Sequence, residues 1–256
     1  MFTGATPQSG RQGLSFLICG AGRGGTSLLM GMMDGHDRLE VGFEHSAVGC
    51  LMGESVRAHG RKLFHQRVER FTKDCDCEAR RFPGRIYGNK ITTEQLAGLE
   101  DHNRENPGAT LDVLDLFFNH YLSGVKVVFI LRDGRTCVKS KVARTGMSVE
   151  EACRRWLYSV EVCKFLRTRH ANNFVVRYED LVTAPEATLS GICDFLGIAF
   201  QHSMLRGTTS QKMPKEYRQG ELDQTKLRLD DVPAQWEERI REGLRWCGYV
   251  GESCLR

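Results

Sequence analysis

The sequence lacks several patterns that would place the protein in a special class. No apolar run approaches the roughly 18 residues needed to cross a bilayer, and the first residues lack the charged-then-apolar pattern of a secretory signal. There is also no internal repeat and no low-complexity tract. We therefore expect a cytoplasmic protein without a transmembrane segment. Of its 256 residues, 1–13 are predicted to be a flexible tail and the rest a single α/β domain.

Signatures of metal and nucleic-acid binding are also weak. The ten cysteines follow no framework spacing and several lie in apolar stretches, which predicts reduced thiols. Cys75 and Cys77 suggest a metal pair, but no second Cys/His pair stands at a zinc-site spacing, so no metal is expected. The net charge of +4 is too small to predict nucleic-acid binding. The arginines are better interpreted as converging on a small polyanionic ligand.

The stretch 15–31 predicts a strand, a glycine-rich turn and the start of a helix. The apolar run Phe16 to Cys19 leads into glycines at 20, 22, 24 and 25, and Thr26-Ser27 opens a second apolar run. Such a junction directs backbone N–H groups and the positive end of the helix dipole at one point, which favours a phosphate. The alternative is a glycine-rich turn without a ligand, although a turn alone needs fewer glycines.

This loop lacks the lysine of a P-loop. In the P-loop pattern, Lys and then Ser or Thr follow the second glycine, whereas here Thr26 follows Gly25. The cation lies inside the loop instead, at Arg23. We infer a phosphate-binding loop whose transferred group is not a metal-bound γ-phosphate.

Strands alternate with helices along the rest of the chain. Short apolar runs at 39–43, 86–90, 125–131 and 174–178 predict strands, and helices are expected at about 46–58, 111–121, 134–144, 148–167, 185–196 and 233–246. This alternation predicts right-handed crossovers and a three-layer α/β/α fold with a central, mostly parallel sheet. In such a sheet, ligands bind outside the carboxyl ends of the strands.

Three strands end in residues that suit a site. Glu44 follows the second strand, Lys90 ends the third, and Arg132 ends the fourth, with Ser140 eight residues further on. Each has an alternative role. Glu44 could be an acid in the first turn of a helix, Lys90 an exposed strand-end lysine, and Arg132 the partner of Asp133 or of a neighbouring acid.

Two further segments each allow two interpretations. Residues 57–85 are rich in Arg, Lys and His, with Phe64 and Phe71 spaced as core residues of an amphipathic helix. The basic side chains are either solvated or form a wall that faces an acidic acceptor. The polar connection from Arg206 to Leu229 has the length of a functional or disordered loop.

Taken together, these motifs resemble the sulfotransferase family, which uses 3′-phosphoadenosine 5′-phosphosulfate and has a P-loop-like nucleotide-binding fold. The segment from Gly20 to Leu29 is similar to the loop that holds the 5′-phosphosulfate, and Arg132 with Ser140 to the pair that binds the 3′-phosphate. Tyr178 in Arg-Tyr-Glu-Asp-Leu resembles the tyrosine that contacts adenine. The cofactor-binding residues that the resemblance implies are Arg23, Gly24, Gly25, Thr26, Ser27, Arg132, Ser140, Tyr178, Arg218 and Gly220. Of these, Arg218 and Gly220 rest on a partial match to a late Arg-Lys-Gly contact, from which Gln219 departs.

The interval from Arg23 to Glu44 resembles that of tyrosylprotein sulfotransferases and their bacterial relatives, which implies Glu44 as the catalytic base. Lys90 resembles their strand-end lysine that contacts the transferring group. Cytosolic small-molecule sulfotransferases carry a histidine base just after that lysine, where this chain has Ile91-Thr92. A late serine that assists transfer cannot be assigned between Ser203 and Ser210.

The resemblance implies transfer of a sulfuryl group to a hydroxyl or amine of a small molecule, glycan, lipid or peptide. Arg23 and Lys90 would stabilise charge during an in-line displacement, and no metal would be needed. Two alternatives remain: a kinase with a degenerate P-loop, and a non-catalytic module that binds nucleotides or glycans. The sequence predicts neither the acceptor nor the oligomeric state.

Overall fold

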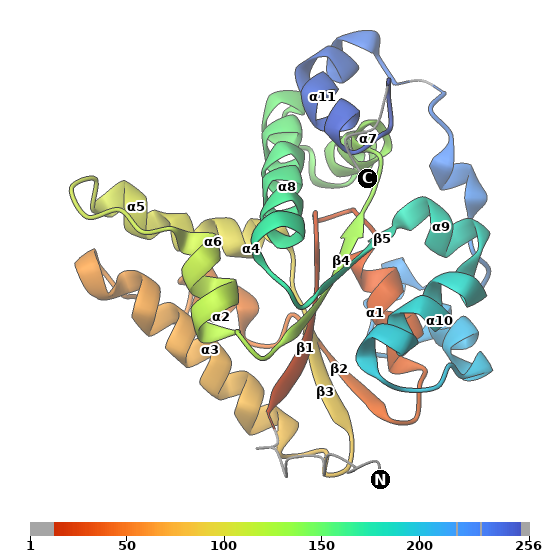
Figure 1. The fold of residues 1–256 in the computed structure, drawn as a ribbon. Helices are drawn as coiled ribbons and strands as arrows, with labels where there is room; N and C mark the ends of the chain where they lie inside the picture. Colours follow the sequence, from red (N-terminus) through yellow and green to blue (C-terminus); the bar gives the residue numbers. More distant parts are fainter. Residues whose placement is uncertain (1–12, 219, 231, 252–256) are drawn as a thin grey trace, which may run out of the picture.

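The protein is built on a five-stranded sheet with the strand order β2-β3-β1-β4-β5, in which every pair of neighbours is parallel (Figure 1). The computed structural model describes residues 13–218, 220–230 and 232–251. Almost all of the expected tail 1–13, together with Gln219 and Cys254, lies outside the described residues. The strands are β1 (Leu14–Gly20), β2 (Leu39–Phe43), β3 (Ile86–Lys90), β4 (Lys126–Leu131) and β5 (Asn173–Arg177).

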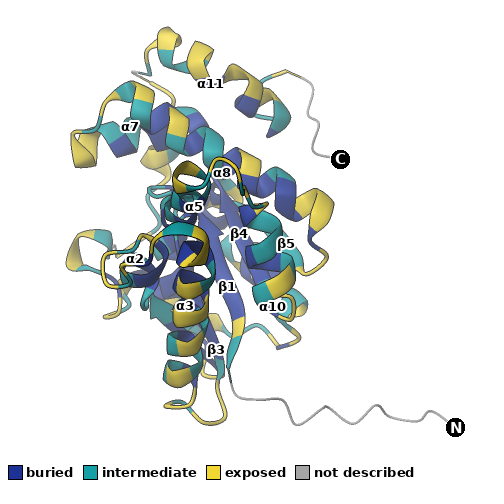
Figure 2. Cartoon of the chain, turned by 90° about the vertical axis from the view of Figure 1, so that its left-hand side faces the viewer, coloured by how far each residue is buried: buried dark blue, intermediate teal, exposed yellow. Residues whose placement is uncertain are grey.

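Helices cover both faces of this sheet, which confirms the three-layer α/β/α prediction. Alternate side chains of β1 enter different cores: Phe16 and Ile18 pack on one face, Leu17 and Cys19 on the other. Burial on both faces explains why the central strands read as continuous apolar runs. Figure 2 shows the same arrangement, with buried strands between helices whose outer sides are exposed.

The helices differ in length from the sequence-based expectation at two places. They are α1 (Thr26–Asp34), α2 (Ala47–Leu51), α3 (Leu63–Ala79), α4 (Thr93–Ala97), α5 (Asp101–Glu105), α6 (Val113–Asp115), α7 (Gly134–Thr145), α8 (Val149–Arg169), α9 (Tyr178–Thr183), α10 (Pro185–Leu196) and α11 (Ala234–Trp246). The helix predicted over 46–58 was wrong in extent, because Gly53 adopts a φ of 80° and the chain turns there against Arg67. The helix predicted over 111–121 is a short α6 followed by a π-helical turn, Leu116–Tyr121.

The basic segment 57–85 resolves largely into α3 and its flanking turns. Phe64 and Phe71 are fully buried, as the spacing predicted. Several basic side chains pair with nearby acids, such as Arg67 with Asp101 at 2.8 Å and Arg81 with Glu78 at 2.8 Å.

The described residues between α10 and α11 form three 3₁₀ segments, His202–Thr209, Lys215–Tyr217 and Gln224–Leu227. Met204 and Met213 pack into the core that contains α1, which fixes this connection against that helix. None of the helices in the described part of the chain has both the length and the apolar character needed to cross a bilayer.

Candidate functional site

A cavity of about 660 Å³ opens at the carboxyl ends of the strands. Most of the predicted site residues line it, namely Arg23, Gly25, Thr26, Ser27, Glu44, Lys90, Arg132, Ser140, Tyr178 and Arg218. Gly24 and Gly220 do not. Gly24 is buried in the turn, where its N–H donates to Ala21 O at 2.8 Å, and Gly220 is exposed. No described residue of 57–85 lines the cavity, so a contact of this segment with an acceptor stays a prediction.

The glycine-rich loop leads from β1 into α1 at one side of the cavity. Arg23 and Gly25 adopt φ angles of 69° and 101°, and α1 begins at Thr26. Packing also requires a glycine at position 25, since a Cβ there would lie 2.4 Å from the ring of Tyr178. The loop therefore packs directly on the predicted adenine contact, with the first turn of α1 open to the cavity.

Arg132 connects this loop to two other parts of the site. Its Nη1 donates to Arg23 O at 3.0 Å, its Nη2 to Lys226 O at 2.8 Å and its Nε to Thr136 Oγ1 at 3.0 Å. The guanidinium lies 4.3 Å from the ring centre of Tyr178. The alternative pairing with Asp133 is wrong, because Asp133 pairs instead with Arg135 at 2.7 Å.

Ser140 and Arg23 meet across the cavity from different elements. Ser140 lies in α7, and its Oγ accepts a hydrogen bond of 3.3 Å from Arg23 Nε. The Arg23 guanidinium also lies 5.1 Å from the ring centre of Tyr217. The loop arginine thus points toward the predicted 3′-phosphate side and contacts the 3₁₀ segments that follow α10.

Glu44 and Lys90 form an ion pair at the ends of neighbouring strands. The parallel register sets Phe43 beside Lys90, and Glu44 N donates to Lys90 O at 2.9 Å. Lys90 Nζ bonds to Glu44 Oε1 and lies 4.2 Å from the ring centre of Phe43. Lys90 is 1% exposed, so the alternative of an exposed strand-end lysine was wrong. Burial lowers the pKa of its ammonium group, and the Glu44 carboxylate opposes that shift.

Glu94 and Gln95 are site residues that the sequence interpretation missed. Glu94 Oε2 accepts from Gly22 N at 2.8 Å, and its other oxygen pairs with the buried Lys141. Gln95 Nε2 donates to Glu44 Oε2 at 2.7 Å. A sequence signal existed, because Thr92-Thr93-Glu94-Gln95 has the capping-box spacing and predicts a helix start directly after β3.

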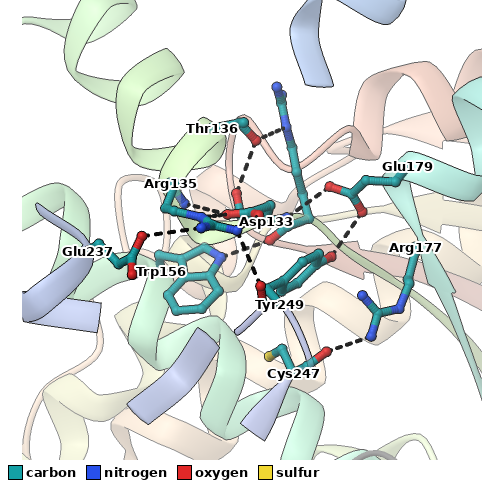
Figure 3. A network of polar contacts seen from close by, with 10 residues as sticks. Asp133, Arg135, Thr136, Trp156, Arg177, Glu179, Glu237, Cys247 and Tyr249 are labelled. Atoms are coloured by element: carbon teal, nitrogen blue, oxygen red, sulfur yellow. Dashed lines mark hydrogen bonds and ion pairs between the residues drawn. The ribbon is translucent and has the colours of Figure 1, made fainter. Parts of the chain in front are cut away.

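The tip of β4 that carries Arg132 is held from behind by the C-terminal segment (Figure 3). Glu179 accepts hydrogen bonds from Asp133 N at 3.0 Å and from the hydroxyl of Tyr249 at 2.9 Å. Trp156 Nε1 donates to Arg132 O at 3.0 Å. Residues on α8, α9 and the end of the described chain therefore fix the backbone from which Arg132 projects.

The described residues contain no group of three or more His, Cys, Asp or Glu side chains placed to hold a metal ion. At the Cys75–Cys77 stretch, Cys75 accepts from Asn89 Nδ2 at 3.4 Å and Asp76 accepts from Leu14 N at 3.0 Å. These side chains are thus used in holding α3 against β1 and β3.

We expect Glu94→Gln to lower the free energy of unfolding by about 3–5 kcal/mol, because the buried Lys141 loses its charged partner. The amide oxygen can still accept from Gly22 N. Urea denaturation measures the change, with Glu161→Gln as control. Glu161 pairs with Lys164 on the surface, so its loss should cost less than about 1 kcal/mol. Equal effects for the two variants would contradict this view of the Glu94–Lys141 pair.

Comparisons with known proteins agree with this geometry. The model of the sulfotransferase family matches residues 15–202. Because that range covers most of the chain, the protein belongs to the sulfotransferase family.

The individual proteins that resemble this chain have low sequence identity to it. A protein-tyrosine sulfotransferase of Drosophila melanogaster is 24% identical over 204 residues, which cover 73% of this chain but only 39% of that protein. Among solved structures, the sulfotransferase domain from the curacin biosynthetic pathway has a TM-score of 0.57 at 17% identity, covering 91% of this chain and 98% of that one. The sulfotransferase domain of the Synechococcus PCC 7002 olefin synthase has a TM-score of 0.56 at 17% identity, covering 94% and 98%. These structures share the fold.

Proposed function

We propose that the protein transfers a sulfuryl group from 3′-phosphoadenosine 5′-phosphosulfate to a hydroxyl or amine of an acceptor. The observation that carries this proposal is the meeting of an anion-binding loop, a second buried cation and a carboxylate–ammonium pair in one cavity. The loop is that of Arg23 to Ser27, the second cation is Arg132, and the pair is Glu44 with Lys90.

The cavity suits a polyanionic adenine nucleotide. Its volume lies within the range of roughly 300–1,000 Å³ that is usual for ligand sites. Nine basic side chains among the described residues line it, namely Arg23, Lys90, Arg132, Lys139, Lys141, Arg155, Arg218, Lys226 and Arg228. In the same described part of the chain, three acidic side chains oppose them, Glu44, Glu94 and Glu216. Tyr178 lines the cavity with the Arg132 guanidinium over its ring, and the absence of a Cβ at Gly25 brings loop and ring together.

When bound, the donor supplies an activated sulfuryl group. The backbone N–H groups at the start of α1 then hold its 5′-phosphosulfate end, and Arg132 with Ser140 holds the 3′-phosphate. Lys90 stabilises negative charge on the sulfuryl oxygens and on the departing phosphate. Glu44 accepts the proton that the attacking hydroxyl or amine loses. The acceptor must therefore bind directly beside the Glu44–Lys90 ion pair.

Ligand-dependent stabilisation tests the nucleotide assignment. Adenosine 3′,5′-bisphosphate at 100 times its dissociation constant should stabilise the fold by about 2.7 kcal/mol, a rise in Tm of about 5–10 °C. ADP at the same concentration should give a much smaller rise, because it lacks the 3′-phosphate that Arg132 and Ser140 bind. The scans are run in EDTA. Equal shifts for the two nucleotides, or shifts that require Mg²⁺, would instead favour the degenerate P-loop kinase.

Incubation with ³⁵S-labelled donor and separate pools of metabolites, lipids, glycans and peptides tests the reaction and identifies the acceptor class. Label transferred to any pool supports an enzyme. Tight nucleotide binding without transfer to any pool would favour the non-catalytic binding module.

A further inference from the structure

Gln95 occupies a defined position between the start of α4 and the end of β2. It is the third residue after Thr92, the N-cap of α4, and is 3% exposed. Its Oε1 accepts from Thr92 N at 2.8 Å, while its Nε2 donates to Glu44 Oε2 at 2.7 Å. A backbone N–H can only donate, so the capping contact fixes which end of the amide is the oxygen. The amide nitrogen must then face Glu44.

Both carboxylate oxygens of Glu44 therefore have a donor from a different strand or helix. Oε1 bonds to the ammonium of Lys90 on β3, and Oε2 bonds to the amide of Gln95 on α4. Without the amide, nothing described at this position would oppose a turn of the carboxylate that places both oxygens on Lys90, whose positive charge attracts each of them. Such a turn would change the direction in which the remaining lone pairs of the carboxylate point, and a base must direct one of them at its substrate.

The backbone at Glu44 adds to this requirement. Glu44 adopts a φ of 54°, in the left-handed region that non-glycine residues seldom occupy. Strain of this kind persists only where surrounding contacts determine the conformation. The hydrogen bond from Glu44 N to Lys90 O and the bond from Gln95 supply two such contacts, one to the backbone and one to the side chain.

We propose that Gln95 is a positioning residue: it holds the Glu44 carboxylate in one orientation and prevents Lys90 from taking both of its oxygens. This inference rests on the proposed function, in which Glu44 is the base. The same turn also places Glu94 on Gly22 N, so adjacent residues of α4 set the geometry of the base and of the phosphate-binding loop. A single capping box thereby aligns the two halves of the reaction site.

Two substitutions separate the donor from the cap. Gln95→Met removes both contacts at similar size. Gln95→Glu keeps an oxygen for Thr92 N, since glutamate is the other residue that forms capping boxes, but it replaces the donor with a second carboxylate oxygen. Asp112→Ala is the matched control, because Asp112 caps α6 away from the cavity.

Crystal structures of the wild type and the variants, each with adenosine 3′,5′-bisphosphate, provide the deciding measurement. We expect the Glu44 carboxylate to leave its wild-type orientation in both Gln95 variants and to keep it in Asp112→Ala. An unmoved carboxylate in Gln95→Met would overturn the proposal. An unmoved carboxylate in Gln95→Glu alone would show that the cap suffices and would likewise overturn the role of the amide donor.

Kinetics give a second readout that a purely structural role would not move. With ³⁵S-labelled donor and tyramine, a probe that carries both a phenolic hydroxyl and an amine, kcat should fall about tenfold in Gln95→Met while the affinity for adenosine 3′,5′-bisphosphate stays unchanged. A parallel loss of nucleotide affinity would contradict positioning of the base alone. Glu44→Gln, measured beside them, separates the two claims: turnover retained there overturns the base, whereas an unmoved carboxylate in Gln95→Met overturns only the role of Gln95.

Discussion

Glu44→Gln is expected to lower kcat by about 10²- to 10⁴-fold and to leave the affinity for adenosine 3′,5′-bisphosphate at its wild-type value. The glutamine keeps the length of the side chain but cannot take the acceptor's proton. Nucleotide affinity should persist because, among the described residues, the Glu44 carboxylate bonds to Lys90 and Gln95, whereas the proposed nucleotide contacts are Arg132, Ser140 and Tyr178. Initial rates with labelled donor give kcat, and calorimetric titration gives the nucleotide affinity.

The same substitution leaves Lys90 buried without its counter-ion, so stability must be measured beside activity. Breaking a buried ion pair from one side costs about 3–5 kcal/mol, and Glu44 is less buried than Lys90, so a value toward the lower end is expected. Glu54→Gln is the control, since Glu54 is an exposed carboxylate ten residues along the chain. A variant that stays folded, binds the nucleotide and still transfers the label at the wild-type rate would show that Glu44 is not the base.

The positions of the strand-end residues could be predicted because the strands are recognisable in the sequence as short apolar runs. A β-branched run such as 125–131 is typical of a strand buried on both faces, and the residue that follows it must emerge at the edge where ligands bind. Arg132, Lys90 and Glu44 were located in this way. The residues that contact these side chains could not be predicted in the same way, because the alternation of strands and helices predicts a parallel sheet but not its strand order.

The burial of Lys90 illustrates that limit. It depends on β2 lying next to β3 in the register that pairs Phe43 with Lys90, a contact between segments far apart in sequence. Gln95 and Glu94 were missed for a related reason: the capping box at Thr92 predicts a helix start, but only the fold shows that its side chains reach Glu44 and Gly22. The basic character of 57–85 could not decide between its two interpretations, because paired surface charge and ligand-binding charge have the same composition.

Gly25→Ala is expected to weaken binding of adenosine 3′,5′-bisphosphate by about 10- to 100-fold and also to destabilise the fold. Two causes act together. A φ of 101° costs a residue with a Cβ about 1–2 kcal/mol or more, and the new Cβ would lie 2.4 Å from Tyr178 Cδ2. The ring must move, and with it the surface proposed to stack on adenine, where aromatic–base stacking contributes about 1–3 kcal/mol.

Gly84→Ala separates these two causes. Gly84 also has a positive φ, 82°, but it is exposed and a Cβ there would meet nothing within 4 Å. It should therefore show the backbone cost in thermal denaturation without any change in nucleotide affinity. If Gly25→Ala also lost only stability, Tyr178 would not form part of the nucleotide site. If it lost affinity beyond the control, the glycine that first indicated a phosphate-binding loop would be required as much for its contact with the tyrosine as for its backbone turn.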